Sequence, residues 1–255
     1  MRIAKQRGQA MVEMIVISFV TLLLLFGIVQ FALLYNAKTV LNYAAYEAAR
    51  IGALNYSHPE SMRLALAQKL AVLEPIDSSA TSSAYDKLVG QREAFITNFD
   101  SKACIRRLNP TNSSGGHWNE AHKTPQSTLG IANDHLLYRD PAAKGANVQS
   151  IQDANLLKIS VTYCPKMMVP IVSQVIQNLM LIDRYELLPD KSFTERKLEG
   201  YTPSGLKPFN KQCYEAGRFP MVASAMMRMQ TPVGNYGFTD NDCEDITTLA
   251  QQLSP

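Results

Sequence analysis

The sequence predicts an α+β protein in which a long N-terminal transmembrane helix precedes an extracytoplasmic domain with a small antiparallel sheet and covering helices. Three observations support this fold class. Residues 14–37 carry no charged side chain, a helical periodicity continues beyond them, and residues 155–163 alternate apolar and polar side chains as a half-buried strand does. We therefore divide the chain into a basic leader (residues 1–8), a transmembrane and assembly helix (9–56) and an outer domain with expanded loops (57–255).

The apolar segment is long enough to cross a membrane, with Met14 to Leu34 as its core. Its 24 uncharged residues would form a helix of about 36 Å, against a hydrocarbon core of about 30 Å. Three cations and no acidic residue precede it: Arg2, Lys5 and Arg7. The positive-inside rule therefore predicts a cytoplasmic N-terminus and a C-terminal domain on the other side. A cleaved secretory signal is the alternative, but such signals have a shorter apolar core and a small-residue cleavage site.

Glu13 lies at the start of this apolar run. An ionisable side chain in hydrocarbon costs a few kcal/mol unless it is paired, so its partner matters. Cleavage between Gly8 and Gln9 would leave an α-amino group on Gln9, with Glu13 as the fifth residue of the product. The amine of one subunit then neutralises Glu13 of its neighbour. The alternative is a glutamate at the level of the cytoplasmic head groups.

The residues of this region carry a family resemblance. Arg7 to Met14 reads Arg-Gly-Gln-Ala-Met-Val-Glu-Met, and Ala44 to Ala53 reads Ala-Ala-Tyr-Glu-Ala-Ala-Arg-Ile-Gly-Ala. A basic leader ending in glycine, four residues, a glutamate and a long apolar helix resemble a type IV prepilin cleavage site. The sequence of these two segments is similar to that of the TadE-like pseudopilins of the tight-adherence (Flp) pilus system. That family typically shows a Gly-Gln-x-x-Val-Glu opening and an Ala-x-x-x-Ala-Arg-x-Gly-Ala helix end.

The resemblance is specific from Arg7 to Leu54, and a weaker one covers Met221 to Thr231, where Ala-Ser-Ala-Met-Met-Arg-Met-Gln-Thr is similar to the family's C-terminal strand ending Arg-Met-Gln. Residues 76–150 depart from the family. Many members carry a proline early in the apolar run, whereas Ser18 to Thr21 reads Ser-Phe-Val-Thr, so a local helix break is not expected here.

The resemblance implies a minor pilin with a type IV pilin-like fold that helps to assemble or initiate a tight-adherence pilus. It implies processing after Gly8 and a single-pass protein of the bacterial inner membrane, with a periplasmic domain that can also enter the pilus. The implied partners are the prepilin peptidase, the major Flp pilin, other pseudopilins and the inner-membrane assembly platform.

The composition agrees with a membrane-anchored module. The net charge is only +3 and no basic patch with interleaved aromatics occurs, which argues against nucleic acid. All four cysteines follow the membrane segment: Cys104, Cys164, Cys213 and Cys243. In an oxidising compartment an even count favours two disulfides, with three possible pairings. Zinc is the competing explanation, but no two cysteines have CxxC or similar spacing. We expect no metal and no cofactor.

Beyond the membrane segment, small and apolar residues recur at helical spacing: Leu33, Ala37, Val40, Ala44, Ala48 and Ile51. This stripe packs either against neighbouring helices or on the protein's own domain. Ser57-His58-Pro59-Glu60 then predicts a helix start with Ser57 as the cap. Its expected apolar face consists of Met62, Leu64, Leu66, Leu70, Val72 and Leu73, and Pro75 ends it.

The middle of the chain is harder to interpret. We expect residues 76–84 to be a loop, Phe95 to Phe99 a short strand and Ala103 to Leu108 another strand. Residues 109–130 have the composition of an exposed loop. They contain a His-x-x-Glu-x-His pattern and the lone tryptophan: His117, Trp118, Glu120 and His122. Since glycines and a proline argue against a helix there, we interpret these histidines, and His135, as solvated.

The C-terminal part supplies the clearest strands. Residues 155–163 and 218–231 alternate, the latter with methionine on both faces. Residues 167–182 predict an uncharged amphipathic helix that covers the sheet or rests on the membrane or a neighbouring subunit. We expect residues 187–211 to be loop and residues 240–255 to be a polar tail with a short helical turn.

No motif in the sequence supports catalysis: Gly-x-Ser-x-Gly, a phosphate loop, a zinc motif and a convincing acid pair are all missing. We therefore predict a structural protein and not an enzyme. Two alternatives remain. One is an uncleaved membrane-tethered envelope-binding protein, and the other is an anchored extracytoplasmic hydrolase whose site is built from scattered residues.

Overall fold

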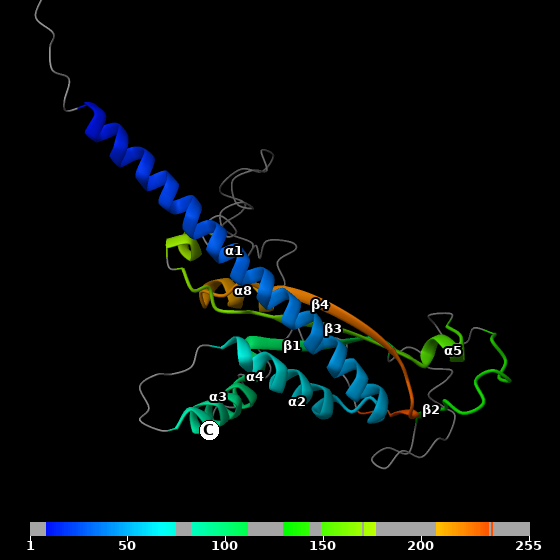
Figure 1. Cartoon of the computed structure of the whole chain (residues 1–255). Coiled ribbons are helices and arrows are strands. Elements are labelled where there is room, and N and C mark those ends of the chain that lie inside the picture. Colours follow the sequence, from blue (N-terminus) through cyan, green and yellow to red (C-terminus); the bar gives the residue numbers. More distant parts are fainter. Residues whose placement is uncertain are drawn as a thin grey trace, which may run out of the picture. The chain divides into compact units, whose positions relative to one another are not determined.

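The computed structural model of the chain describes residues 9–74, 83–111, 130–142, 149–169, 171–176, 208–234 and 236 (Figure 1). They fall into two compact units. One contains the chain up to Asn36 together with residues from Met167 onward, and the other contains Ala37 to Lys166 and the chain from Ser204 onward.

Helix α1 runs from Gln9 to Leu54, 46 residues or about 70 Å of uninterrupted helix. The expected continuous helix is thus confirmed, and it is long and apolar enough to cross a membrane. No break occurs at the position where many pilins carry a proline. Instead, the hydroxyl groups of Ser18 and Thr21 donate hydrogen bonds of 2.9 and 2.8 Å to carbonyls of the preceding helical turn.

The larger unit is built on a three-stranded antiparallel sheet in the order β1-β3-β4. Its strands are β1 (Ala103–Asn109), β3 (Leu156–Tyr163) and β4 (Met221–Arg228). The central strand β3 pairs along its whole length with β4, from Leu156 opposite Arg228 to Tyr163 opposite Met221. The small antiparallel sheet and all three of these expected strands are therefore confirmed.

The alternation of apolar and polar side chains in β3 reflects one buried and one exposed face, as expected. One face of the strand is buried, and it consists of Leu157, Ile159, Val161 and Tyr163. Lys158 on the other face is exposed. In β4, Met221 is buried whereas Met226 is exposed, so methionine does occupy both faces of that strand.

The C-terminal half of α1 packs in the core of this unit together with the buried face of the sheet. Its buried residues are nearly all alanine: Ala37, Leu41, Ala44, Ala45, Ala48, Ala49 and Ala53. Small side chains let a helix approach its neighbours closely. Of the two alternatives for the stripe, the structure therefore shows packing on the protein's own domain, while Leu33 at the start of the predicted stripe is exposed.

Gly52 marks the closest approach of α1 to its surroundings. A β-carbon at this position would meet the Met62 sulfur, and it would lie 2.8 Å from Leu157 Cδ2. Real β-carbons do not come this close to other heavy atoms, so the glycine lets α1, α2 and β3 come together without a methyl group between them.

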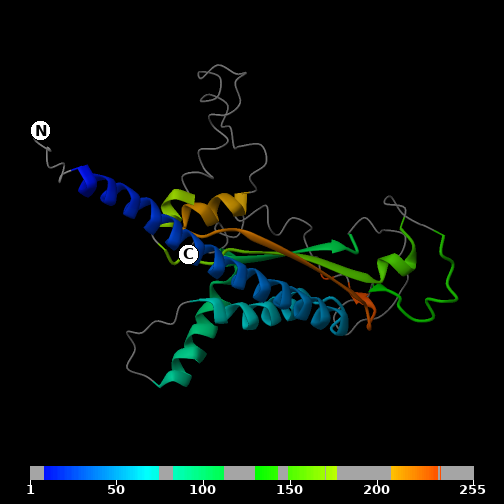
Figure 2. The same ribbon diagram turned by 45° about the horizontal axis from the view of Figure 1, so that its top comes forward.

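The remaining elements surround this core, with α2 alongside the C-terminal half of α1 and α3 directed away from it (Figure 2). The helices are α2 (Pro59–Leu70), the 3-10 turn η1 (Ala71–Leu73), α3 (Ala84–Thr97), α4 (Phe99–Lys102), α5 (Ile151–Ala154) and α8 (Pro208–Glu215). A second two-stranded antiparallel sheet pairs β2 (Gly130–Ile131) with β5 (Val233–Gly234).

The strand expected from Phe95 to Phe99 is wrong. This stretch contains the end of α3 and the beginning of α4. Ser83 caps α3 by accepting a hydrogen bond from the backbone of Asp86, and the rings of Phe95 and Phe99 then meet edge to face, 6.1 Å apart. Burial of both rings outweighs the β propensity of this sequence.

The cap expected at Ser57 is also wrong. Ser57 has a left-handed backbone conformation, with φ of 60°, and His58 is the residue before helix α2. Pro59 does occupy the first turn. Within the expected apolar face, Leu64 and Val72 are exposed, Val72 by 80%, whereas Met62, Leu66 and Leu70 are buried.

Two further expectations need correction. Residues 208–211 belong to helix α8 and not to a loop. In the segment 167–182, residues 171–176 are helical as expected, and residues 177–182 lie outside the described residues. The helix belongs to the unit that contains the N-terminal half of α1 and not to the unit that contains the sheet. His117, Trp118, Glu120 and His122, most of the loop at 76–84 and the tail at 240–255 lie outside the described residues.

Candidate assembly site

Glu13 lies one turn into α1 with its side chain exposed. Its neighbours Val12 and Met14 are exposed as well, by 63% and 71%. Within the described part of the chain, no side chain forms an ion pair with Glu13. Gln9 is the first helical residue, and it lies one helical turn from Glu13. Gly8, the other residue of the expected cleavage site, lies outside the described residues.

The N-terminal half of α1 presents an apolar surface in nearly every direction. Large side chains are exposed throughout it, and they include Ile15, Val16, Ile17, Phe19, Leu24, Leu25, Ile28 and Phe31. Such a surface is unstable in water but is suited to lipid or to other apolar helices. The long apolar helix therefore indicates membrane anchoring.

The other end of α1 is capped by the residues that follow β4. The carbonyl oxygen of Ala53 accepts hydrogen bonds from the backbone N–H groups of Gln230 and Thr231, at 3.0 and 3.2 Å. The Thr231 hydroxyl donates to the same oxygen at 3.1 Å and accepts from the Tyr56 N–H at 2.9 Å. The Tyr56 carbonyl in turn accepts from Gly234 of β5. These contacts replace hydrogen bonds that the last helical turn lacks.

A second contact joins α1 to β4 near the other end of the strand, where Lys38 donates a hydrogen bond to the Val222 carbonyl. Between Lys38 and Ala53 the helix rises about 22 Å. Between Val222 and Gln230 an extended chain advances about 26 Å. The helix and the strand are thus tied at both ends over matching lengths, which makes the outer half of α1 one rigid piece with the sheet.

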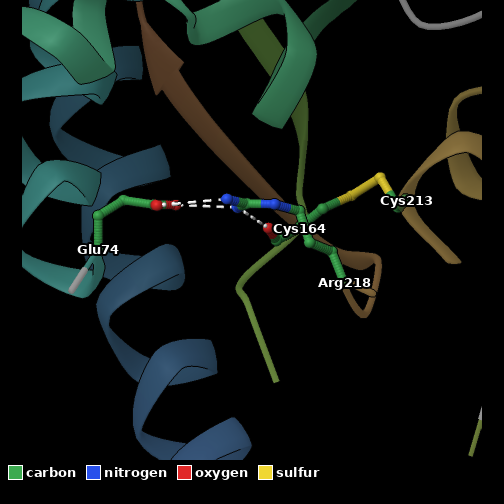
Figure 3. Close-up of a disulfide and its surroundings, with 4 residues drawn as sticks. All are labelled: Glu74, Cys164, Cys213 and Arg218. Atoms are coloured by element: carbon green, nitrogen blue, oxygen red, sulfur yellow. Dashed lines mark hydrogen bonds and ion pairs between the residues drawn. A yellow bond between two sulfur atoms is a disulfide. The ribbon is translucent and has the colours of Figure 1, made fainter. Parts of the chain in front are cut away.

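A buried charge cluster ties the remaining elements together (Figure 3). Arg218 donates to both carboxylate oxygens of Glu74, at 2.9 and 3.3 Å, and to the Cys164 carbonyl at 2.8 Å. Lys102 and the Tyr163 hydroxyl donate to the same carboxylate, at 3.2 and 3.3 Å. The side chains of Glu74 and Arg218 are only 9% and 15% exposed. The cluster links the end of η1 to α4, β3 and the segment before β4.

The electrostatics of the cluster fix its protonation state. Burial raises the pKa of Glu74, but hydrogen bonds and positive charge from Arg218 and Lys102 outweigh it and hold that pKa below its usual range. Burial, and next the Glu74 charge, raises the pKa of the Tyr163 phenol. Glu74 is therefore ionised at neutral pH, and Tyr163 remains a hydrogen-bond donor.

Helix α8 brings Cys213 and Arg218 to this cluster. Gly217 has a φ of 72°, and its N–H bonds to the Tyr214 carbonyl while the Arg218 N–H bonds to the Cys213 carbonyl. This is the hydrogen-bond pattern of a Schellman motif, and the left-handed glycine turns the chain back over the helix end. Cys213 forms a disulfide with Cys164, the residue whose carbonyl Arg218 binds.

The structure also accounts for a third cysteine. Cys104 is disulfide-bonded, so none of the described cysteines is a free thiol. Cys243 lies outside the described residues. His135 is part of a turn and has a φ of 50°. In the described ranges, no group of three or more His, Cys, Asp or Glu side chains is arranged to hold a metal.

The sequence identified the assembly helix but not these ties within the domain. Glu74, Lys102 and Arg218 are scattered over the chain and form no local pattern. Lys38 is the first charged residue after the apolar run, and its position in the sequence does not indicate a contact with β4. For the contact at Thr231 a signal did exist, because the segment that precedes it resembles the C-terminal strand of the pseudopilins.

Comparisons with known proteins bear on the N-terminal segment. Residues 8–50 match the family model of TadE-like proteins. Over this segment the chain is similar to a pilus-component family, as its residues indicate, and that family is not known for enzymatic activity. The match suggests involvement in the Tad pilus system. No curated protein and no solved structure matches the chain.

Proposed function

We propose that this chain is a pseudopilin, a minor pilin that helps to assemble or initiate a tight-adherence type IV pilus after prepilin peptidase cleaves it behind Gly8. One observation carries the proposal: the family match that begins at residue 8 coincides with an apolar helix on which Glu13 is exposed. The remaining implied partners are the major Flp pilin, sibling pseudopilins and the inner-membrane assembly platform.

The proposed chemistry is charge pairing between helices. Removal of the leader places a positive α-amino group on Gln9, at the edge of the membrane, where an isolated carboxylate is costly. The Gln9 amine of one subunit then neutralises Glu13 of its neighbour and sets the axial register of the two helices. In an environment of low polarity such a pair is stronger than in water.

The domain contacts give this pairing a consequence outside the membrane. Because α1 is tied to β4 through Lys38 and Ala53, a displacement of the helix carries the sheet with it. Packing of α1 against neighbouring helices would in this way bring the outer domains of adjacent subunits together. The alanines in the C-terminal half of α1, such as Ala44 and Ala48, are already buried in their own domain.

The first test is the mature N-terminus of the protein, expressed with its own pilus machinery and measured by mass spectrometry. We expect a chain that starts at Gln9, and an intact Met1 would overturn the proposal. Replacing Glu13 by Ala should leave cleavage unchanged but impair piliation. The matched control is Met14→Ala, which changes an equally exposed neighbour without removing the charge. Normal piliation by the Glu13 variant would rule out the pairing role.

A further inference from the structure

A polar side chain is buried within the apolar segment of α1. Gln30 is only 1% exposed, and its Oε1 atom accepts a hydrogen bond of 3.0 Å from the backbone N–H of Val169. Gln30 and Val169 belong to the same compact unit. Although 139 residues separate them in sequence, this bond fixes the chain at Val169 to the level of Gln30.

That level lies within reach of the hydrocarbon. Gln30 follows Glu13 by 17 residues, which is about 25 Å along the helix, and it precedes Lys38 by about 12 Å. With Glu13 at the cytoplasmic edge of a core about 30 Å thick, Gln30 lies just inside its outer boundary. Val169 therefore lies at the same depth, near the outer leaflet.

Most of the exposed side chains around Val169 are apolar, and Gln174 is an exposed polar one. No charged residue occurs between Lys166 and Asp183. Residues 171–176 form a short helix, which lies beside α1 in both Figure 1 and Figure 2. Three apolar side chains of the segment are half exposed or more: Met168 by 57%, Ile171 by 54% and Val175 by 50%. Ile171 and Val175 are four residues apart and share one helix face.

We infer that residues 167–169 and 171–176 form a membrane hook, a segment that is held by α1, enters the outer leaflet of the membrane and places Met168, Ile171 and Val175 against lipid acyl chains. Large apolar side chains are exposed on α1 of the same unit as well, such as Phe31. Backbone groups that enter hydrocarbon need hydrogen-bond partners. Gln30 supplies one for Val169, and the Val169 carbonyl accepts from Ser173.

This segment differs from the common interfacial helix, which relies on Lys and Arg to bind anionic lipids. The hook carries no charge, so its insertion depends on apolar contact and on the tie to α1. The inference requires that α1 spans the membrane, but it does not require a role in a pilus. Its failure would thus leave the proposed function standing, and the reverse also holds.

The test uses the full chain in phosphatidylcholine vesicles whose acyl chains carry bromine, which quenches tryptophan on contact. Trp118 is the single tryptophan, so Trp118→Phe provides a silent background. In it, Ile171→Trp should lose about half of its fluorescence, as a residue at the hydrocarbon boundary would. Phe31→Trp on α1 is the positive control, and Val72→Trp, an 80% exposed position of the other unit, is the negative control.

Two further measurements determine how deeply residue 171 lies in the membrane and which kind of lipid it contacts. Bromine near the head group should quench Ile171→Trp more than bromine near the chain end, whereas Leu22→Trp, near the middle of the apolar segment of α1, should show the reverse. Replacing phosphatidylcholine by an anionic lipid should change neither result. Quenching no greater than that of Val72→Trp would overturn the inference. Quenching that appears only at a low ratio of protein to lipid would also overturn it. In that case a second copy of the protein covers Ile171 at higher ratios, and lipid reaches the residue only after the copies separate. Met168→Trp provides the same readout if Ile171→Trp fails to fold.

Discussion

The carbonyl oxygen of Ala53 accepts hydrogen bonds from both the backbone N–H and the hydroxyl of Thr231, which lies 178 residues later. Ala53 is in the last turn of α1, where carbonyls have no donor within the helix. Thr231 follows β4, and both the end of α1 and the strand before Thr231 resemble pseudopilin segments. The contact therefore joins the C-terminal end of α1 to the chain that follows β4.

The first prediction concerns this contact. Thr231→Val keeps the shape of the side chain but removes the hydroxyl, so the Tyr56 N–H loses its acceptor. We expect a loss of about 1–2 kcal/mol in the free energy of unfolding, because a partly buried donor is left unpaired. Urea denaturation of the detergent-solubilised full-length protein measures it. Thr97→Val, which removes an exposed hydroxyl bonded within its own helix, should cost clearly less. Equal losses in the two variants would contradict the special role of Thr231.

The second prediction concerns the close approach at Gly52. Gly52→Ala should gain about 1 kcal/mol in helix propensity. The added methyl group meets Met62 and Leu157, however, and overpacking of this kind costs about 1–3 kcal/mol. We expect a net loss of stability, measured as a lower denaturation midpoint. Gly90→Ala is the matched control, because nothing lies within 4 Å of the new β-carbon, and it should raise the midpoint. A Gly52 variant that behaves like the Gly90 variant would refute the packing argument.

Much of this architecture follows from patterns that act locally. The long helix is predictable because an uncharged run and a small-residue stripe share one helical period, and β3 is predictable because Lys158 alternates with buried apolar residues. The strand expected at Phe95 to Phe99 failed because local β propensity was outweighed by burial of two rings from helices. The sequence of a short aromatic stretch does not show which tertiary contacts its side chains form in the folded protein.

The polar contacts could not have been derived in this way. Glu74 and Arg218 are 144 residues apart, and the sequence around each residue contains no pattern that predicts their contact. Gln30 is a partial exception, because the side-chain amide of a glutamine within a charge-free apolar run is expected to have a hydrogen-bond partner. The answer, the backbone N–H of Val169, required the fold.

The third prediction concerns the disulfides. Cys164 pairs with Cys213, and Cys104 is also disulfide-bonded. Because the sequence contains one further cysteine, we expect Cys104 to be linked to Cys243. Proteolysis without reduction should therefore yield two linked peptide pairs, identified by mass spectrometry. Labelling of any thiol by iodoacetamide before reduction would contradict this. Replacing Cys164 and Cys213 together by serine should cost about 2–4 kcal/mol, since their link closes a long loop of the unfolded chain.

The last prediction concerns pH. The pKa of Glu74 is lowered from 4.5 in the folded protein, so folding is stabilised by the ionised form. This contribution is fully present above about pH 4.5 and disappears as the pH falls through the lower, folded-state pKa. Glu74→Gln should thus reduce the free energy of unfolding at pH 7 by about 3 kcal/mol, because Arg218 and Lys102 lose a buried partner. The difference from wild type should shrink as the pH falls below about 4.5, which urea denaturation at each pH measures. Glu60→Gln, with a side chain 68% exposed, should leave stability nearly unchanged across the range. A Glu74→Gln deficit that stays constant with pH would contradict a role for the charge of the carboxylate.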